Sequence, residues 1–244
     1  MNILITGGTK GIGRATALRF ASEGNQLFLN YFHDHQAAKN TADECESKGA
    51  NVFLLQYNAG EPVHIKEMAN QVQDEVDQMD LVVHCAAGVI QGNTLEISPE
   101  DWRKAVSVSS LSLIDVVREL RPILKNGSSI IALSSRGATN YVPNYAALGT
   151  TKAFTEGIVR YLAYELAPDG ISVNIVSAGP LNTEAFRSMF PNNADERLQA
   201  AANANPSGRG LEFEDVTNTI AFLASADAKM IKGRNIFIDG GLYL

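Results

Sequence analysis

The chain has 244 residues, 45% of them hydrophobic and 19% charged, which predicts a folded protein with a large core and excludes a disordered one. Its formal net charge of −7, with scattered lysines and arginines, argues against a nucleic-acid-binding protein. Its apolar runs are far shorter than the roughly 20 residues that a membrane span needs. We expect no targeting leader, because the sequence enters the first strand directly. Its cysteines and histidines form no metal-binding motif. We therefore predict a cytoplasmic protein with no membrane, nucleic-acid or metal partner.

Short apolar segments rich in β-branched residues alternate with amphipathic stretches of helical length. The expected strands are residues 3–6, 26–31, 51–57, 81–86, 129–134, 171–176 and 235–239. The expected helices are residues 12–23, 36–48, 62–77, 100–124, 145–167 and 214–225. This alternation predicts an α/β fold of the Rossmann type, with one doubly wound parallel sheet of about seven strands and helices on both faces.

No linker, internal repeat or charge block divides residues 1–244, so we expect one domain. The least regular region is 179–211, where Asn, Pro and Gly are concentrated at the ends. We expect this segment to be an insertion that covers a pocket.

The segment TGGTKGIG, residues 6–13, stands between the first expected strand and the first expected helix. At this point of an open α/β sheet, a helix N-terminus can bind dinucleotide phosphates, and glycines let the backbone approach them closely. The spacing of its glycines differs from the general GxGxxG fingerprint, and such a turn also suits tight packing of a strand on a helix. We predict cofactor contacts from Gly7, Thr9, Lys10, Gly11, Ile12 and Gly13.

Further motifs follow the glycine turn in a fixed order: HCAAG at 84–88, Ser135 after the fifth strand, a Tyr/Lys pair on the next helix, Asn174, and IDGG at 238–241. Together with TGxxxGxG, they resemble the short-chain dehydrogenase/reductase family over essentially the whole chain. The resemblance implies a dinucleotide-binding and catalytic domain over 1–244, and a homo-oligomer, usually a tetramer. It also implies cofactor contacts from Asn30, Asn58, Ala86, Ala87, Gly88, Lys152, Gly179, Pro180 and Thr183.

The end of the second expected strand bears on the choice between NAD(H) and NADP(H). An acidic side chain there usually accepts hydrogen bonds from the ribose 2′-hydroxyl of NAD, whereas LNYFHD places Asn30 at that point. Without that negative charge the site can accept the 2′-phosphate of NADP(H), and Lys10 can offer this phosphate a positive charge. Asp34 keeps NAD(H) open if the strand runs longer, and Lys10 can equally be a solvated loop residue. We predict that NADP(H) is favoured over NAD(H).

The stretch NYAALGTTK, residues 144–152, departs from the usual family pattern, in which a tyrosine lies four positions before the lysine. Leu148 occupies that position, and the nearest tyrosine is Tyr145, seven positions before Lys152. At about 100° per residue, spacings of four and seven both return the two side chains to nearly one helix face. Tyr145 can therefore face the same cleft as Lys152 if it lies at the helix start, which Asn144 favours as an N-cap.

The Tyr-x6-Lys spacing resembles the enoyl-acyl-carrier-protein reductase branch of the family, and its type III enzymes most. The SAGPLNT turn at 177–183 is similar to that of enoyl reductases, and Ser109 stands where ketoreductases commonly have an asparagine. Ser135 matches the ketoreductases, although type III enoyl reductases also have a serine there. The resemblance implies NADPH-dependent reduction of the 2,3 double bond of an enoyl thioester.

In such a reaction, Tyr145 would stabilise negative charge on the thioester oxygen, Lys152 would hold the nicotinamide ribose and lower the phenol pKa, and Ser135 would be a second donor. Apolar and aromatic side chains near this set are expected to line the substrate pocket: Tyr141, Tyr145, Phe186, Met189 and Phe190. Each assignment has a plain alternative. Tyr145 can pack on Pro143, Lys152 can be a surface lysine, Ser135 can be a cap, and the stripe at 186–190 can be ordinary core.

Two other functions remain open. A 3-oxoacyl or other carbonyl reductase, or an alcohol dehydrogenase, suits Ser135 and the family background. A catalytically silent sensor or scaffold that binds NADP(H) would keep the glycine turn but has no need of the three catalytic residues. The chain contains no carrier-domain motif, so an acyl carrier protein bearing the acyl thioester would be a separate partner.

Overall fold

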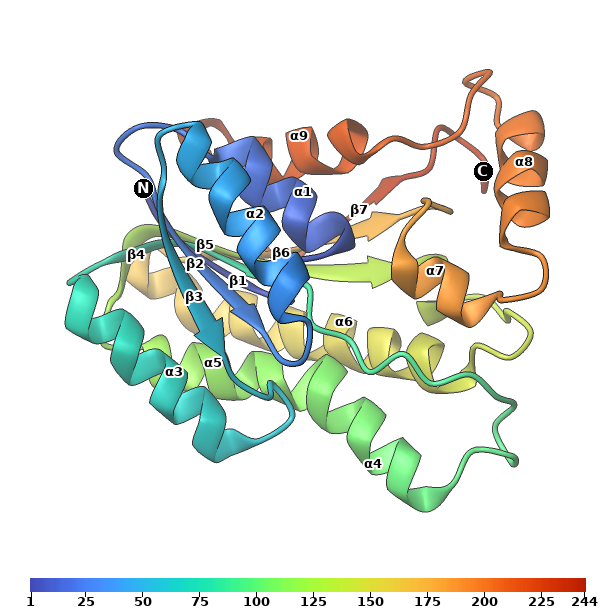
Figure 1. The fold of residues 1–244 in the computed structure, drawn as a ribbon, viewed down its shortest axis with the longest axis horizontal. Coiled ribbons are helices and arrows are strands. Elements are labelled where there is room, and N and C mark those ends of the chain that lie inside the picture. Colours follow the sequence, from blue (N-terminus) through green and yellow to red (C-terminus); the bar gives the residue numbers. More distant parts are fainter.

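A computed structural model describes residues 1–244 and contains one seven-stranded parallel sheet in the order β3-β2-β1-β4-β5-β6-β7 (Figure 1). The strands are β1 (Asn2–Thr6), β2 (Gln26–Tyr31), β3 (Asn51–Gln56), β4 (Met79–His84), β5 (Leu124–Ser135), β6 (Ser172–Ala178) and β7 (Asn235–Ile238). The predicted doubly wound fold of the Rossmann type is confirmed.

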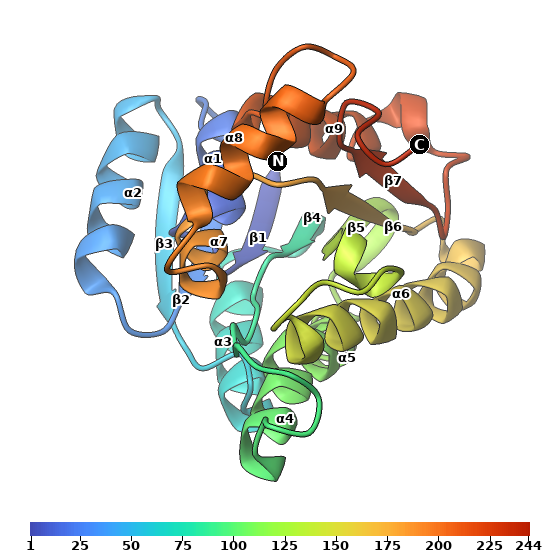
Figure 2. The same cartoon turned by 90° about the vertical axis from the view of Figure 1, so that its right-hand side faces the viewer.

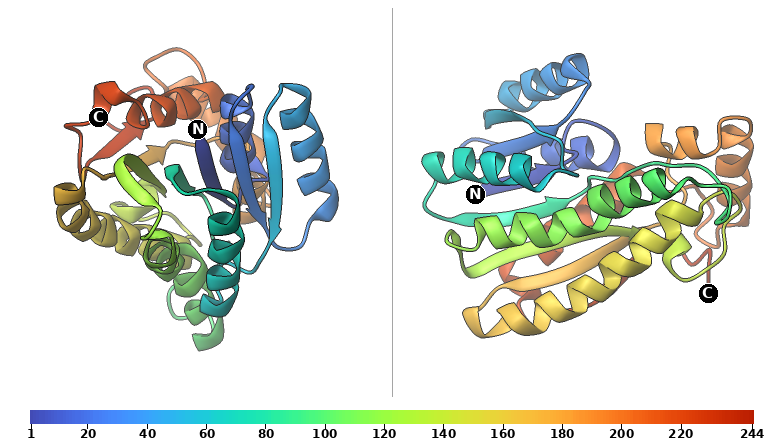
Figure 3. Two further views of the ribbon diagram at one scale, coloured as in Figure 1. Left: turned by 90° about the vertical axis from the view of Figure 1, so that its left-hand side faces the viewer. Right: turned by 90° about the horizontal axis from the view of Figure 1, so that it is seen from below.

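Helices cover both faces of the sheet, as the views in Figure 3 show. One face carries α1 (Gly11–Phe20), α2 (His35–Ser47) and α9 (Phe213–Leu223), and the other carries α3 (Pro62–Glu75), α5 (Ser112–Leu120) and α6 (Ala146–Leu166). The alternation within β1 shows how the sequence produces two cores. Leu4 packs in the core under α3, α5 and α6, while Ile3 and Ile5 pack in the core under α1 and α9.

The single helix expected over residues 100–124 is interrupted. It consists of α4 (Pro99–Val106), a π-helical stretch from Ser107 to Leu111, and α5, after which the chain enters β5 at Leu124. A π-helical stretch changes the hydrogen-bond step of the backbone without changing residue composition, so apolar spacing did not reveal it. The stretch brings Ser109 against the end of β4, where it contacts the predicted site.

Region 179–211 contains two further helices, α7 (Glu184–Met189) and α8 (Ala194–Ala204). Thr183 caps α7, because its hydroxyl accepts a hydrogen bond of 3.0 Å from the Phe186 N–H. Arg187 of α7 pairs with Asp195 of α8 at 2.6 Å. Figure 2 looks onto the carboxyl ends of the strands and shows both helices in front of them.

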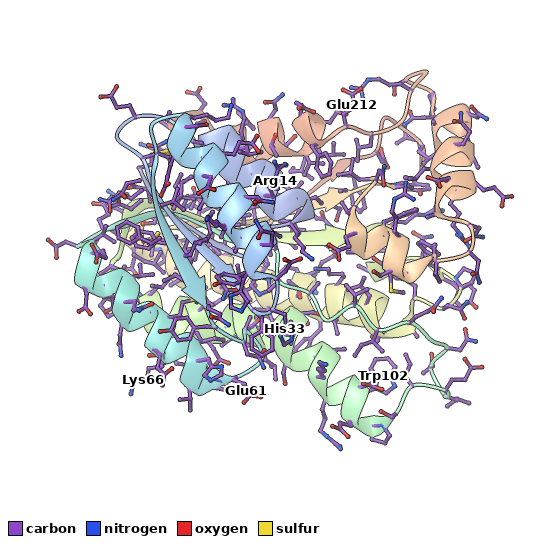
Figure 4. All side chains as sticks on the ribbon, in the orientation of Figure 1. Arg14, His33, Glu61, Lys66, Trp102 and Glu212 are labelled. Carbon is purple, nitrogen blue, oxygen red and sulfur yellow. The ribbon has the colours of Figure 1, made fainter.

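The sheet has a topological switch point between β1 and β4. β1 pairs with β2 on one side and with β4 on the other, so the connecting helices leave toward opposite faces and a crevice opens at the carboxyl ends. On the α1 side of the molecule, Arg14 reaches across to pair with Glu44 of α2 (Figure 4). No helix is both long enough and apolar enough to span a membrane.

Candidate active site

A cavity of about 420 Å³ occupies the crevice at the carboxyl ends of the central strands. Most of the predicted site residues line it: Gly7, Lys10, Gly11, Ile12, Gly13, Ala86, Ala87, Ser135, Tyr145, Lys152, Gly179, Thr183, Phe186 and Met189. A second cavity of about 470 Å³ is lined by three more of them, Tyr141, Pro180 and Phe190. Ser135 and Tyr145 belong to the walls of both cavities, so this pair lies where the two adjoin.

The glycine turn is shaped for close approach by a ligand. Gly7 and Gly11 have φ values of 62° and 50°, which glycine adopts without strain. A Cβ on Gly13 would lie 2.1 Å from the carbonyl oxygen of Gly7, so no side chain fits there. Because Lys10 provides no side-chain cap, the first N–H groups of α1 remain available at the cavity wall. This arrangement fits the phosphates of a dinucleotide.

Four predicted cofactor residues do not line the first cavity: Thr9, Asn30, Asn58 and Gly88. The Thr9 carbonyl accepts a hydrogen bond from Thr41 of α2. The amide of Asn58 caps its own turn by accepting from the Gly60 N–H.

Asn30 illustrates why a position at a strand end need not face the ligand. Its side chain is only 2% exposed, and its amide donates to the carbonyls of Leu55 and Tyr57 while its oxygen accepts from the Gly7 N–H. Asn30 therefore supports the glycine turn from beneath and does not line the cavity, and its direct contact with a cofactor stays a prediction.

Lys10 lines the first cavity and lies between two carboxylates. Its ammonium lies 2.6 Å from Asp34 and 2.8 Å from Glu184. The hydrogen bonds that Lys10 donates to these carboxylates raise the pKa of Lys10, and the bond with Asp34 lowers the pKa of Asp34. Asp34 also caps α2 by accepting from the Ala37 N–H, so β2 has ended before it. Lys10 is thus a charged group at the cavity, not an isolated loop lysine.

The hydroxyls of Ser135 and Tyr145 lie 3.3 Å apart. Ser135 is the last residue of β5, and Tyr145 is the N-cap of α6, so strand and helix each deliver one hydroxyl to the junction of the cavities. Asn144 is not the N-cap that we predicted. It lies one residue earlier with a φ of 59°, and the turn it forms places Tyr145 itself at the helix start.

Two glycines pack against the Tyr145 ring. A Cβ on Gly137 would lie 2.6 Å from the ring, and one on Gly149 would lie 3.4 Å from it. The Phe190 ring is nearly parallel to the Tyr145 ring at a centroid distance of 6.4 Å. The phenol is therefore positioned by close packing as well as by its contact with Ser135.

Lys152 is buried, with 6% of its surface exposed, which excludes the surface-lysine alternative. Burial lowers its pKa to about 8, and no hydrogen bond to the protein offsets that effect. The prediction that Lys152 lowers the pKa of Tyr145 is wrong for this structure. Burial raises the phenol pKa, and only the hydrogen bond with Ser135 acts in the opposite direction. The phenol is consequently protonated at neutral pH and can donate a hydrogen bond.

Ser109 and His84 support the site from behind. The Ser109 hydroxyl accepts a hydrogen bond of 2.9 Å from the Gly88 N–H, and its carbonyl accepts one from the Thr155 hydroxyl of α6. His84, fully buried at the end of β4, contacts the Ser112 hydroxyl at 2.7 Å. Burial, with a smaller effect from Lys152, lowers the pKa of His84 to about 3, so it is neutral. These contacts hold α5 and α6 against β4.

The apolar stripe of α7 both lines the cavities and forms a small core. Met189 and Phe190 pack with Leu148 and Ala194, and Phe186 lies against this cluster. Leu148, which occupies the usual tyrosine position, also lines the first cavity. The predicted pocket role and the ordinary core role therefore coexist in the same side chains.

Several lining residues were not predicted as site residues: Cys85, Ser134, Leu148 and Glu184 in the first cavity, and Arg136, Arg197 and Tyr243 in the second. Leu148 and Cys85 lie inside motifs that were recognised, so their positions could have been read from those motifs. Glu184 and Arg197 belong to α7 and α8, whose placement over the sheet depends on contacts far apart in sequence. The structure contains no group of three or more His, Cys, Asp or Glu side chains suited to a metal ion.

Residues 7–243 match the family model described as enoyl-(acyl carrier protein) reductase. The chain belongs to the short-chain dehydrogenase/reductase family. Among its relatives in this family, 1-cyclohexenylcarbonyl-CoA reductase from Streptomyces collinus is 30% identical and aligns with 98% of this chain and 85% of its own length. The 3-oxoacyl-[acyl-carrier-protein] reductase FabG from Staphylococcus epidermidis is also 30% identical, over 99% of this chain and 98% of its own.

Solved short-chain dehydrogenase/reductase structures share the fold over the full length. The enoyl-[acyl-carrier-protein] reductase (NADH) from Aquifex aeolicus superposes with a TM-score of 0.88 at 30% identity, covering 100% of this chain and 96% of that one. A short chain dehydrogenase from Burkholderia cenocepacia in complex with NADP gives a TM-score of 0.90 at 25% identity, covering 99% and 97%. The protein is therefore an oxidoreductase of this family with a dinucleotide-binding fold.

Proposed function

We propose that this protein reduces the 2,3 double bond of an enoyl thioester with NADPH. The observation that carries the proposal is the displacement of the tyrosine to Tyr145, three residues farther from Lys152 than the usual family spacing. Three helical residues correspond to about 4.5 Å along the axis. In carbonyl reduction the carbon that receives hydride bears the oxygen, whereas in enoyl reduction the oxygen lies two carbons away. A tyrosine placed farther from Lys152 along the helix suits enoyl reduction, in which the oxygen lies farther from the carbon that receives hydride.

Each residue would then have a distinct task. When bound, the nicotinamide supplies a hydride, which reaches the β-carbon of the substrate. Lys152, buried and without a hydrogen-bond partner in the protein, would hold the ribose hydroxyls of the cofactor. Negative charge develops on the thioester oxygen, and the protonated phenol of Tyr145 would donate a hydrogen bond to it. A proton from solvent water would then reach the α-carbon of this enolate and complete the saturated thioester. Ser135, 3.3 Å from that phenol, would fix its direction or donate in turn.

The preference for NADP(H) over NAD(H) rests on Lys10. Lys10 and Lys152 are the cations that line the first cavity, Lys10 belongs to the glycine turn, and Asn30 adds no negative charge at the end of β2. Asp34 and Glu184 already accept hydrogen bonds from Lys10, so a 2′-phosphate would have to compete with both carboxylates. One relative in the family was solved with NADP and another is named for NADH, and comparing the KM of this protein for NADPH and NADH will decide the preference.

Reduction of a 3-oxoacyl thioester is the second candidate, and the Ser135–Tyr145 pair favours it. A serine hydroxyl can bind a carbonyl oxygen while the protonated phenol beside it donates the proton. The relative named as a 3-oxoacyl reductase is also as similar in sequence, at 30% identity, as the one named as a cyclohexenylcarbonyl-CoA reductase. The two reactions are distinguished by steady-state rates on crotonyl and acetoacetyl thioesters with NADPH. Higher kcat/KM for the crotonyl compound supports the proposal, and activity on the acetoacetyl compound alone overturns it.

The acyl thioester would be presented by a separate acyl carrier protein or by coenzyme A. We expect a cytoplasmic enzyme, in keeping with Cys45 and Cys85, which are both free thiols.

We also expect a homo-oligomer, most simply a tetramer. An aromatic stripe on α6 is exposed, with Phe154 at 45%, Tyr161 at 72% and Tyr164 at 85%, and it offers an apolar face to a second copy. Sedimentation of the protein as a monomer at micromolar concentration would refute this expectation.

A further inference from the structure

The second cavity contains two arginines that no part of the proposed reaction uses. Arg136 follows Ser135 directly, and Arg197 comes from α8, 61 positions farther along the chain. The rest of the wall is mainly aromatic and aliphatic, and it includes no Asp, Glu or Lys. In a chain with a formal net charge of −7, this cavity therefore has two positive charges and no negative one.

Neither arginine is paired with a carboxylate. Elsewhere in the protein, Arg14, Arg118, Arg121, Arg187 and Arg209 each form a salt bridge, and Arg19, Arg103, Arg160 and Arg234, which line neither cavity, form none. By contrast, the Arg136 guanidinium lies 3.6 Å from the centre of the Tyr243 ring and the Arg197 guanidinium lies 4.2 Å from the centre of the Phe190 ring. Ring contacts hold a guanidinium in place and leave its in-plane N–H groups free.

The donors of the two groups are almost entirely available. The Nε of Arg197 donates to the Asn193 side chain at 3.2 Å, and its two terminal nitrogens make no hydrogen bond within the protein. The Arg136 guanidinium makes only its contact with Tyr243. Each is half-buried, so each has N–H groups beside apolar walls that donate to no protein atom. Such groups favour an anion, and a planar guanidinium can bind a carboxylate or phosphate through two parallel hydrogen bonds.

The two arginines lie close to the reacting centre. Ser135 and Tyr145 form part of the same cavity wall, and Arg136 is the next residue after Ser135. Arg197 lies on the Phe190 ring, and that ring lies 6.4 Å from the Tyr145 ring. A substrate whose carbonyl oxygen meets the Tyr145 hydroxyl can thus extend into this cavity and reach both guanidinium groups.

From this arrangement we infer that the second cavity is a subsite for an anionic group of the substrate, a carboxylate or a phosphate, bound by Arg136 and Arg197. The inference rests on the proposed function in one respect, because it assumes that a thioester carbonyl lies at Tyr145. The anion can come from either end of the thioester. It is a carboxylate at the far end of the acyl chain, or a phosphate on the pantetheine arm.

Binding of saturated thioesters to the protein saturated with NADP⁺, measured by calorimetry, tests the subsite without any turnover. The probes are the N-acetylcysteamine thioesters of pentanoate, which is neutral, and of glutarate, which has a carboxylate in place of the terminal methyl. Pentanoyl-CoA adds phosphates on the thiol side instead. We expect one of the anionic probes to bind at least about tenfold more tightly than the neutral one. Preference for the glutaryl probe places the anion on the acyl chain, and preference for pentanoyl-CoA places it on the thiol arm.

Arg136→Gln and Arg197→Gln should each reduce that preference by about tenfold while leaving affinity for the neutral probe within about twofold. Arg103→Gln on the exposed surface of α4 is the matched control and should change neither value. Equal affinity for all three probes overturns the subsite. Failure of both anionic probes to bind overturns it as well. A loss of affinity that is the same for neutral and anionic probes in both variants also overturns it, because it shows a purely structural role.

The binding measurements can be made and interpreted whichever reaction the protein catalyses. Absence of turnover on crotonyl and acetoacetyl thioesters would refute the proposed function while leaving the binding preference measurable. Normal turnover of a crotonyl thioester with no preference among the probes would refute only the subsite.

Discussion

The Cβ position of Gly137 lies 2.6 Å from the ring of Tyr145, closer than real Cβ atoms approach their neighbours. Gly137 stands in the 3₁₀ turn that follows β5, and Tyr145 stands at the start of α6. The absence of a side chain at Gly137 therefore determines where the phenol can lie. This contact links the turn after β5 to the position of the proposed hydrogen-bond donor.

Replacing Gly137 by alanine should displace the Tyr145 ring and lower kcat. A displacement of about 1 Å in a reacting group can cost up to about 100-fold in rate, so we expect a fall of roughly 10- to 100-fold with NADPH affinity little changed. Gly210→Ala is the control, because its new methyl group would meet only Ala202 at an ordinary 3.4 Å. Equal rates for Gly137→Ala and the wild type would show that the ring position is not critical.

Tyr145→Phe removes the proposed donor while keeping the ring that packs on Gly137. Loss of one donor to a developing oxyanion typically costs on the order of 100- to 1,000-fold in kcat, and we expect that range here. Ser135→Ala should cost less, about tenfold, because Tyr145 remains. Since the two hydroxyls are in contact, the double variant should be little slower than Tyr145→Phe alone. Steady-state kinetics on a crotonyl thioester measure all three, and fully multiplicative effects would argue that the hydroxyls act separately.

The buried Lys152 should make stability depend on pH in the cofactor-free protein. Its pKa in the folded state, about 8, lies below its ordinary value of 10.5, so between these values the unfolded chain binds more protons and stability rises with pH. The penalty for burying the charge is fully present below pH 8 and is relieved as the pH rises above it. Between pH 7 and 9.5, the unfolding free energy of the wild type should gain on the order of 1–2 kcal/mol relative to Lys152→Met.

Urea unfolding of both proteins at the two pH values provides this difference, because the titration of all other groups cancels between them.

The protonation of Lys152 should also govern cofactor binding, because only the charged amine donates strongly to ribose hydroxyls. Affinity for NADPH should therefore fall above about pH 8 in the wild type and stay flat in Lys152→Met. A wild type whose affinity does not change up to pH 10 would contradict this role for Lys152.

Cofactor choice should respond to the charges around Lys10. Lys10→Met should reduce the preference for NADPH over NADH by about tenfold, since a charged partner of the 2′-phosphate is lost. Asp34→Asn should increase it by a few-fold, and asparagine preserves the helix cap that Asp34 provides to the Ala37 N–H. The ratio of kcat/KM values for the two cofactors reports both changes. A wild type with the lower KM for NADH would contradict the preference itself.

The sequence was most informative where local rules determine structure. β-branched runs and helical periodicity predicted the seven strands and most helices, and the spacing of Tyr145 and Lys152 predicted that both can face one cleft. The helix at 100–124 was predicted without its break, because a π-helical stretch leaves the apolar pattern almost unchanged. Asn144 was assigned the cap since it is a good capping residue, but its left-handed backbone places it outside the helix.

Contacts between distant residues could not be predicted from the same patterns. Lys10 pairs with Glu184, which lies 174 positions away, and nothing in the glycine turn indicates that partner. The burial of the Asn30 amide depends on the carbonyls of Leu55 and Tyr57, so its position at a strand end alone could not predict it. Arg136 and Arg197 stand in unrelated segments, and only the placement of α8 over the sheet brings them into one cavity.

The most direct test of the central claim is a competition between two substrates in one reaction. Equimolar crotonyl and acetoacetyl N-acetylcysteamine thioesters are incubated with the protein and limiting NADPH, and the products are quantified by mass spectrometry. The product ratio equals the ratio of kcat/KM values for the two substrates. We predict at least about tenfold more butyryl than 3-hydroxybutyryl thioester, a difference of about 1.4 kcal/mol in transition-state stabilisation. An excess of the 3-hydroxybutyryl product would contradict the account and make the protein a carbonyl reductase.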